Sequence, residues 1–253
     1  MKNNMVSDYR KTRYKVSNYK INAPIERRIV VIADLHERPL AVSQISELRP
    51  DMIAIVGDFI RGHAIERSSL QLLSALSGIA PTYYSMGNHE SNYDGCVSKK
   101  QKRRIRLSGA VPLDNQIEEK NGVLIGGWSP GKYRGQHWHP NMGFMRGVAR
   151  RKAVYKIMLC HNPEFIEHVW WYERTDHHSG SDLMISGHAH GGQIQLFGHG
   201  LFAPGQGVWP KYTRGVYEGK DAGCTLVVSA GLSNTAPVPR LFNKPEIVVV
   251  DLG

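Results

Sequence analysis

Five strand-like segments, each followed directly by a polar loop, constrain the fold of this chain more than any other feature. They span residues 28–33, 52–56, 82–86, 154–159 and 183–186. Continuous apolar and β-branched runs of this length are typical of strands that are buried on both faces. Each segment ends in a loop that holds Asp, His or Asn. Because ligands of open α/β sheets bind beyond the carboxyl ends of the strands, the five loops are expected to meet at one site.

The first three segments alternate with helical patterns, as in strand–helix–strand units. Apolar residues recur at helical spacing in 42–49 and 68–76, and a third helix is predicted over 163–171, where Pro163 suits a first turn. Further strands are predicted at 123–126, 193–197, 225–229 and 247–251. Glycines and prolines mark two long loops, 127–147 and 198–219. Without a repeat or a clear linker, the pattern favours one α/β domain over residues 1–253.

The polar loops contain a set of metal-binding side chains. In chain order the candidate ligands are Asp34, His36, Asp58, Asn88, His161, His188 and His190. Carboxylate, imidazole and amide oxygen together suit Mn²⁺, Fe or Zn²⁺. The D-x-H and H-x-H spacings place two side chains on one side of an extended segment, so each pair can point to the same centre. The set exceeds what one tetrahedral ion needs, which favours two metals with Asp58 between them.

The ordered blocks D-x-H, G-D, G-N-H-E, H and G-H-A-H resemble those of the calcineurin-like metallophosphoesterase superfamily. The continuation through Gln193-Ile194, Leu232, Pro239-Arg240 and Pro245-Glu246-Ile247 resembles the bacterial YaeI/YkuE-like phosphodiesterase branch. The resemblance implies a four-layer α/β/β/α sandwich with two central mixed sheets. It also implies a metal-dependent phosphoric ester hydrolase with two di- or trivalent metal ions. In the implied mechanism a metal-bound hydroxide attacks the phosphorus in line, and no covalent enzyme intermediate forms.

The same resemblance implies a role for each site residue. Asp34, His36 and His190 would hold the first metal, and Asn88, His161 and His188 the second, with Asp58 bridging them as a catalytic ligand. Asn88 and His89 would contact the substrate, and His89 would protonate the leaving oxygen or stabilise charge on the phosphoryl group. For Glu90 two interpretations are open: a carboxylate that orients a ligand, or the start of a helix.

Several functions fit this site. A phosphodiesterase is the leading hypothesis, and a nuclease or a sugar-nucleotide or lipid-linked pyrophosphatase are the alternatives. A binding scaffold without catalysis is least favoured, because Asp58, Asn88 and His89 are all present. Capping of turns by polar residues explains one or two of the ligand positions but not five ordered blocks.

The net charge of +10 favours anionic partners, and residues 99–106 hold six cations in eight positions. This basic run is either a solvated helix face or a contact for nucleic acid or an anionic membrane. It has no aromatic residues to stack bases. Trp128, Tyr133 and Trp138 are candidates for a substrate groove, whereas Trp170 and Trp171 are predicted to be core residues.

The location of the protein is predicted from what the sequence lacks. The first twenty residues are basic and polar, no window holds the roughly 18 apolar residues of a membrane span, and the three cysteines form no CxxC pair. We therefore expect a cytoplasmic protein, with peripheral membrane association as an open alternative, although the resembling branch often begins with an export signal or anchor. Within the basic segment 1–23, residues 14–23 are predicted to add a strand. No sequence feature specifies an oligomer.

Overall fold

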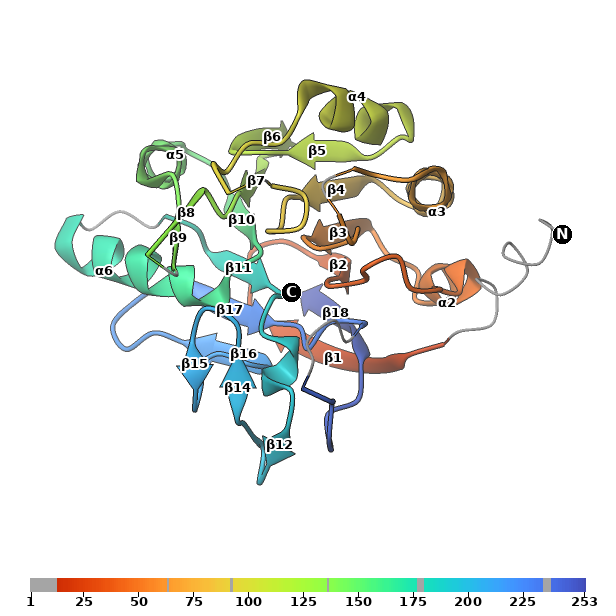
Figure 1. Cartoon of the computed structure of the whole chain (residues 1–253). Coiled ribbons are helices and arrows are strands. Elements are labelled where there is room, and N and C mark those ends of the chain that lie inside the picture. Colours follow the sequence, from red (N-terminus) through yellow and green to blue (C-terminus); the bar gives the residue numbers. More distant parts are fainter. Residues whose placement is uncertain (1–12, 63, 92, 136, 177–179, 234–237) are drawn as a thin grey trace, which may run out of the picture.

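Two six-stranded sheets pack face to face at the centre of the molecule (Figure 1). The computed structural model describes residues 13–62, 64–91, 93–135, 137–176, 180–233 and 238–253. The first sheet runs in the order β1 (Lys15–Ile21), β18 (Glu246–Leu252), β2 (Arg27–Ile32), β3 (Met52–Val56), β4 (Thr82–Ser85) and β5 (Val111–Leu113). The second runs β16 (Gly215–Glu218), β17 (Thr225–Val228), β11 (Leu183–Ser186), β10 (Tyr155–Cys160), β7 (Val123–Trp128) and β6 (Gln116–Lys120). Both sheets mix parallel and antiparallel pairs.

Helices cover the outer faces of both sheets. Helices α2 (Val42–Glu47), α3 (Arg67–Ser77) and α4 (Lys99–Leu107) lie beside the first sheet, and α5 (Met142–Ala149) and α6 (Ile166–Asp176) beside the second (Figure 1). A 3-10 turn, η1 (Pro163–Phe165), leads into α6 and begins with the proline expected at its first turn. The predicted four-layer α/β/β/α sandwich with two mixed sheets is confirmed.

The alternation of side chains along each strand explains why the strand sequences are apolar throughout. In β2, Val30 and Ile32 pack among the α2 and α3 residues, whereas Ile29 and Val31 pack between the two sheets. Successive side chains of a strand point to opposite faces, so a strand covered on both sides needs apolar residues at every position. The inter-sheet cluster also contains Leu159 of β10, and it therefore joins the two sheets.

Parallel pairing sets where the site is built. Strands β2, β3 and β4 are parallel neighbours in the first sheet, and β10 and β11 are parallel neighbours in the second. The carboxyl ends of parallel strands meet at one edge of a sheet, and here the two edges face each other across the inter-sheet core. Ser85 of β4 donates a hydrogen bond to the Leu159 carbonyl of β10 near this edge, at 2.8 Å.

Three predictions about the later half of the chain were wrong. Residues 127–147 are not a loop, because they form the hairpin of β8 (Lys132–Arg134) and β9 (His137–His139) and the start of α5. Residues 198–219 hold the short strands β13 (His199–Gly200), β14 (Phe202–Ala203), β15 (Gly207–Val208) and β16. The predicted strand 193–197 shrinks to β12 (Gln195–Leu196), because Gln193 and Phe197 adopt left-handed backbone angles.

Of the two tryptophans predicted to be core residues, one is buried and the other is exposed. Trp170 is buried as predicted, but Trp171 is 59% exposed, because consecutive residues of a helix point about 100° apart and only Trp170 faces the core. The added N-terminal strand is present as β1, which pairs in parallel with β18. Residues 1–12 of the basic segment lie outside the described residues. Within the described part of the chain, no helix combines the length and apolar character that crossing a membrane requires.

Candidate metal centre

Left-handed backbone angles recur among the candidate ligands in the loops at the carboxyl ends of the strands. The φ angle is positive at Asp34 (50°), His36 (46°), Asp58 (50°), His188 (66°) and His190 (47°). For residues other than glycine such angles cost about 1–3 kcal/mol, and they cluster at functional sites. The D-x-H and H-x-H segments are therefore not extended, contrary to the expectation from their spacing. Tight left-handed turns, rather than strand alternation, direct both members of each pair inward.

One half of the site is centred on Nε2 of His161. This atom lies 3.1 Å from Oδ1 of Asn88, 3.1 Å from Nδ1 of His188 and 3.2 Å from Oδ2 of Asp58. Ligand atoms bound to one ion at about 2.1 Å are separated by about 3.0–3.4 Å from their nearest neighbours. The spacing around His161 therefore matches a coordination shell.

The other half of the site holds Asp34, His36 and His190, whose ligand atoms lie within 4.8 Å of one another. Nε2 of His190 is 3.7 Å from Oδ1 of Asp34. Oδ2 of Asp58 lies 3.7 Å from Nε2 of His36, and the same oxygen faces His161. Asp58 thus stands between the two halves, and the structure brings all seven predicted ligands together.

Hydrogen bonds and missing partners both fit a metal at this position. Nδ1 of His161 donates to the Val56 carbonyl at 2.9 Å, and Nδ1 of His190 donates to the Ser233 carbonyl at 3.2 Å. Each bond fixes the ring so that Nε2 points into the site as a ligand. Both ring nitrogens of His36 are buried without a hydrogen-bond partner among the described residues. Buried polar atoms are seldom left unsatisfied, and a bound ion would satisfy the one that faces Asp58.

The pKa of His161 is shifted in the opposite direction from those of the other three histidines among the candidate ligands. Burial lowers the pKa of His36 to about 4, and burial also lowers those of His188 and His190, so these rings are neutral near pH 7. For His161, burial opposes the charge, but Asp58 and Asp34 outweigh it and raise the pKa to about 10. Without a metal, His161 is therefore a cation paired with Asp58. A metal would take the place of that proton.

Glu90 connects the loops that follow β3 and β4 of the first sheet. Its buried carboxylate accepts hydrogen bonds from the backbone N–H groups of Asp58 (2.9 Å), Phe59 (3.0 Å), Ile60 (3.3 Å) and Gly87 (2.7 Å), and from the Tyr84 hydroxyl (2.8 Å). Burial raises the pKa of this carboxyl group, and nearby Asp58 raises it further. Of the two interpretations, orientation of a ligand is the one that these contacts support, since Asp58 and the loop of Asn88 are both fixed by Glu90.

Glycine is required where the loops come closest. A Cβ atom on Gly87 would lie 2.2 Å from Oδ1 of Asp58 and 2.5 Å from its backbone nitrogen. Real Cβ atoms do not approach other atoms so closely, so Gly87 lets the Asn88 loop pack directly against Asp58.

His89 lies at the open side of the site. Its Nδ1 contacts the Arg61 carbonyl at 2.5 Å, its backbone N–H donates to Oδ1 of Asp58 at 2.9 Å, and its Nε2 is 3.9 Å from Oδ2 of Asp58. A cavity of about 240 Å³ adjoins it, lined by Arg61, Asn88, His89, Ser91, Tyr93 and Trp138. A ligand in this cavity would contact His89 and Asn88 directly.

Two of the lining residues, Tyr93 and Trp138, are aromatic, and both pack against Tyr133, which is not itself among the lining residues. The ring of Tyr133 lies 5.7 Å from that of Tyr93 and 4.9 Å from that of Trp138. The Tyr133 N–H also donates to the Tyr93 carbonyl at 2.8 Å, which joins the β8–β9 hairpin to the loop after β4. Trp138 is therefore placed where a groove residue was predicted. Trp128 is not, because it is buried in the core beside α5.

Two positioning residues were not predicted. Arg240 donates to the Ser233 carbonyl at 2.6 Å, and this carbonyl in turn holds His190. The Asn243 amide donates to the backbone carbonyls of His190 at 2.7 Å and Gln193 at 3.0 Å. Arg240 belongs to the tail segment that resembles the YaeI/YkuE-like branch, which is the one signal in the sequence that pointed to it.

The two-sheet fold and the cluster of His and Asp residues define a metal-dependent phosphoric ester hydrolase. Comparison with known families agrees, since the family model described as Calcineurin-like phosphoesterase matches residues 27–192. This is more than half of the chain, and the chain belongs to that family.

Relatives with curated names support the same branch. YkuE of Bacillus subtilis, named an uncharacterized metallophosphoesterase, is 37% identical over 86% of this chain and 73% of its own length. Phosphodiesterase YaeI of Escherichia coli is 27% identical over 73% of this chain and 67% of its own length. The uncharacterized metallophosphoesterase Cj0846 of Campylobacter jejuni is 27% identical over 91% of this chain, which spans 60% of that relative. The chain thus belongs to the bacterial branch that includes YaeI and YkuE.

Proposed function

We propose that the protein is a phosphodiesterase that works with two metal ions. The observation that carries the proposal is the position of Asp58: its Oδ2 faces His161 at 3.2 Å on one side and His36 at 3.7 Å on the other. One carboxylate oxygen between two sets of ligands is the arrangement of a bridging ligand. Asp34, His36 and His190 would hold one ion, and Asn88, His161 and His188 the other.

Bound metals would polarise the phosphoryl oxygens and lower the pKa of a bound water molecule. The protein contributes position and charge around them. Asn88 reaches both the metal cluster and the open cavity, so its amide also orients the phosphate. His89 is held from two sides by Arg61 and Asp58, which leaves Nε2 free to donate a proton to the leaving oxygen. Mn²⁺, Fe and Zn²⁺ all suit this ligand set.

The cavity beside His89 supports a diester rather than a monoester. A diester carries a second organic group, and the wall of Tyr93 and Trp138 offers an aromatic surface for it. Arg61 on the rim of the same cavity adds a cation for the phosphate. The name of the Escherichia coli relative, a phosphodiesterase, agrees with this preference.

The test compares bis-p-nitrophenyl phosphate with p-nitrophenyl phosphate, with Mn²⁺, Fe²⁺ or Zn²⁺ supplied in turn. We expect hydrolysis of both substrates and a higher kcat/KM for the diester. Replacement of His89 by Ala should lower kcat by about 10²–10⁴-fold, the usual range for general acid catalysis.

The matched control is His199→Ala, because His199 is exposed on β13 and has no role in the site. It should retain wild-type activity. No turnover of either substrate with any of the three metals would contradict the proposed function. A kcat/KM that favours the monoester would reject only the preference for diesters.

A further inference from the structure

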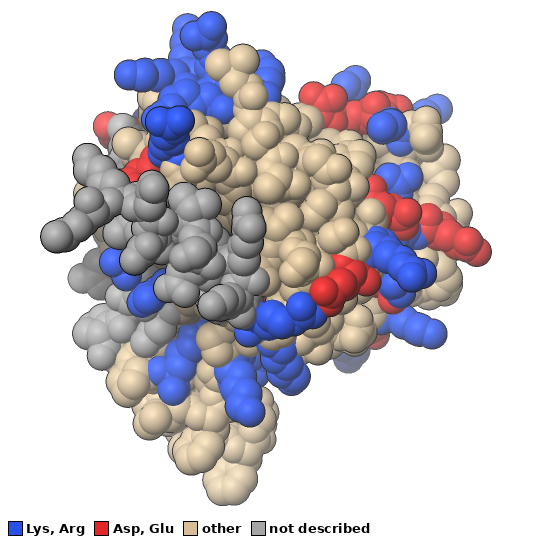
Figure 2. All heavy atoms as spheres, turned by 90° about the vertical axis from the view of Figure 1, so that its right-hand side faces the viewer, with Lys and Arg blue, Asp and Glu red and all other residues tan. Residues whose placement is uncertain are grey.

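Helix α4 carries a stripe of cations outside the metal centre. Lys99, Lys102, Arg103 and Arg106 recur at intervals of three and four residues, which places them along one side of the helix. Lys99, Arg103 and Arg106 are exposed. Figure 2 shows Lys and Arg side chains gathered at the end of the molecule where Figure 1 places α4.

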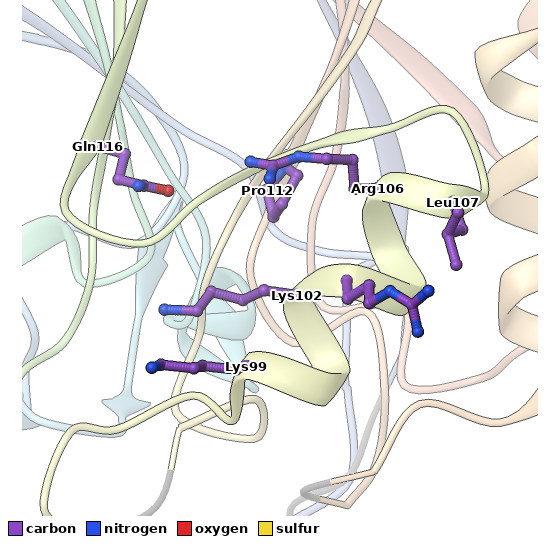
Figure 3. A pocket seen from close by; sticks show the side chains of 7 residues that line it. Lys99, Lys102, Arg106, Leu107, Pro112 and Gln116 are labelled. Atoms are coloured by element: carbon purple, nitrogen blue, oxygen red, sulfur yellow. The ribbon is translucent and has the colours of Figure 1, made fainter.

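The stripe lines a groove of about 490 Å³, called here the α4 groove. Leu107 of the helix, Pro112 of β5 and Gln116 of β6 complete its lining. In Figure 3 the side chains of Lys99, Lys102 and Arg106 extend from α4 toward the side where Gln116 lies. The volume is typical of small-molecule pockets. Because the groove has two walls, it suits a compact ligand better than a flat bilayer.

The positive charge of the α4 groove is largely uncompensated. Nζ of Lys102 pairs with Oδ2 of Asp114 at 2.7 Å. Within the described part of the chain, no acidic side chain lies within ion-pair distance of Lys99, Arg103 or Arg106.

A second basic groove shows the contrast. It is larger, about 660 Å³, and its lining holds Glu26, Asp51 and Asp251 beside its cations. Arg28 of that groove pairs with Asp251 at 2.7 Å. Three carboxylates thus offset most of the charge of the four cations in that lining, whereas Lys99, Arg103 and Arg106 of the α4 groove remain available to a ligand.

We propose that the α4 groove binds a compact anion that contains two or more linked phosphate groups. The seven residue steps from Lys99 to Arg106 extend over about 10 Å of helix, so these cations match a short chain of negative groups better than one ion. Ammonium and guanidinium groups both bind phosphate through charge-assisted hydrogen bonds. The described residues that line the groove include no aromatic ring, so they offer an attached nucleobase no stacking surface. The phosphate chain is therefore the part that is recognised.

The test measures binding by calorimetry to the metal-loaded protein, with tripolyphosphate, ATP and adenosine as separate ligands. Metal content is determined after each titration to exclude extraction of the ions. Tripolyphosphate and ATP should bind with affinities within about threefold of each other, adenosine should not bind, and added salt should weaken binding.

The key variant is Lys99→Ala/Arg106→Ala, and its matched control is Arg151→Ala/Lys152→Ala, which removes one Arg and one Lys from an exposed site beside α5. The first double variant should bind tripolyphosphate at least tenfold more weakly than the wild type. The affinity of the control should stay within twofold of the wild-type value. Both should hydrolyse bis-p-nitrophenyl phosphate at the wild-type rate, so this test does not depend on the proposed function.

Four results would overturn the proposal. If Lys99→Ala/Arg106→Ala bound tripolyphosphate with unchanged affinity, the binding would be assigned to the metal centre. If the control lost as much affinity, the binding would be assigned to the net positive charge of the protein. Tight binding of ATP without binding of tripolyphosphate would mean that the base is recognised. Binding of anionic vesicles or duplex DNA without binding of tripolyphosphate would mean that the groove serves a macromolecular surface instead.

Discussion

At the scale of single residues, Glu90 shows how the site depends on side chains outside the set of candidate ligands. One oxygen of Glu90 accepts from the N–H groups of Asp58 and Gly87, and the other accepts from Phe59, Ile60 and Tyr84. A neutral amide cannot accept all of these hydrogen bonds, because one oxygen is replaced by a donor.

Glu90→Gln should therefore destabilise the protein by about 2–4 kcal/mol, measured by urea unfolding, since buried donors lose a charged acceptor. Metal affinity should also fall by about 10–100-fold. Glu167→Gln is the control, because Glu167 pairs with Lys211 at the surface and its loss should cost less than about 1 kcal/mol. Equal effects of the two changes would show that Glu90 has no special role.

The charge state of His161 gives a prediction about pH. In the metal-free protein its pKa is raised to about 10 while that of His36 is lowered to about 4. At pH 8 His161 should therefore carry a proton on both ring nitrogens and His36 on one. The ¹⁵N chemical shifts of the imidazole nitrogens report this directly, and addition of metal should convert His161 to its neutral form. A neutral His161 at pH 8 before metal is added would contradict the assigned pairing with Asp58.

The seven candidate ligands could be identified from the sequence because they follow recognisable strands in a fixed order. Arg240 and Asn243 could not be assigned a role in the same way. They act through backbone carbonyls of Ser233 and His190, and such contacts depend on how the chain returns to the site, not on residue type. The left-handed angles of Asp34 and His36 were also missed, since only glycine signals them in a sequence.

At the scale of elements, the loops that pack against each other set the geometry of the centre. The loop between β4 and α4 touches Asp58 through Gly87, where a side chain would lie 2.2 Å from the carboxylate. The same loop carries Asn88 and His89. A shift of this loop would therefore displace a candidate ligand and the proposed proton donor together.

Gly87→Ala is expected to lower kcat/KM by at least about 10²-fold, because small displacements of catalytic groups have effects of this size. Gly62→Ala is the control, since a Cβ atom there would have no neighbour within 4 Å among the described residues, its chain neighbours aside. Activity of Gly87→Ala close to that of Gly62→Ala would mean that the loop can move away from Asp58 without harm.

The β8–β9 hairpin is expected to bind the organic part of the substrate. Trp138→Ala should lower kcat/KM for bis-p-nitrophenyl phosphate by about 5–100-fold, as loss of one stacking ring does. The decrease in kcat/KM for methyl p-nitrophenyl phosphate should be smaller. Trp171→Ala, which removes an equally large but distant exposed ring on α6, should change neither. A uniform loss for both substrates in Trp138→Ala would indicate damage to the centre rather than lost contact.

Long elements could be predicted and short ones could not. Strands β2, β3, β10 and β11 are continuous apolar runs that are recognisable by themselves. Strands β12 to β15 contain two residues each, too few for any periodic pattern, and their pairing arises from the packing of the surrounding loops. For this reason residues 198–219 were expected to be one long loop.

At the scale of the whole molecule, the candidate metal centre lies where the two sheets meet. Asp34, Asp58 and Asn88 come from loops of the first sheet, and His161 and His188 from loops of the second. Because the candidate ligands come from both sheets, a bound metal would favour the folded state over the unfolded chain. The layered fold could be expected from the family resemblance, whereas the crossing of ligands between sheets follows only from the packing.

Removal of metal should therefore lower the melting temperature. At a metal concentration 100 times Kd, binding raises the free energy of unfolding by about 2.7 kcal/mol. This corresponds to a rise in melting temperature of roughly 5–10 °C for a chain of this size. Thermal unfolding with and without a chelator measures it, and Asp58→Asn should show a much smaller difference. An equal melting temperature in both states would argue against metal binding between the sheets.

The central claim is a two-metal centre that hydrolyses phosphodiesters, and titration of metal into the metal-free protein tests it most directly. Bound metal is counted by elemental analysis while hydrolysis of bis-p-nitrophenyl phosphate is followed in the same samples. Activity should rise until two metal ions are bound per chain and then remain constant, and Asp58→Asn should bind less metal and stay inactive. Full activity with one bound ion, or two bound ions without any hydrolysis, would contradict the account.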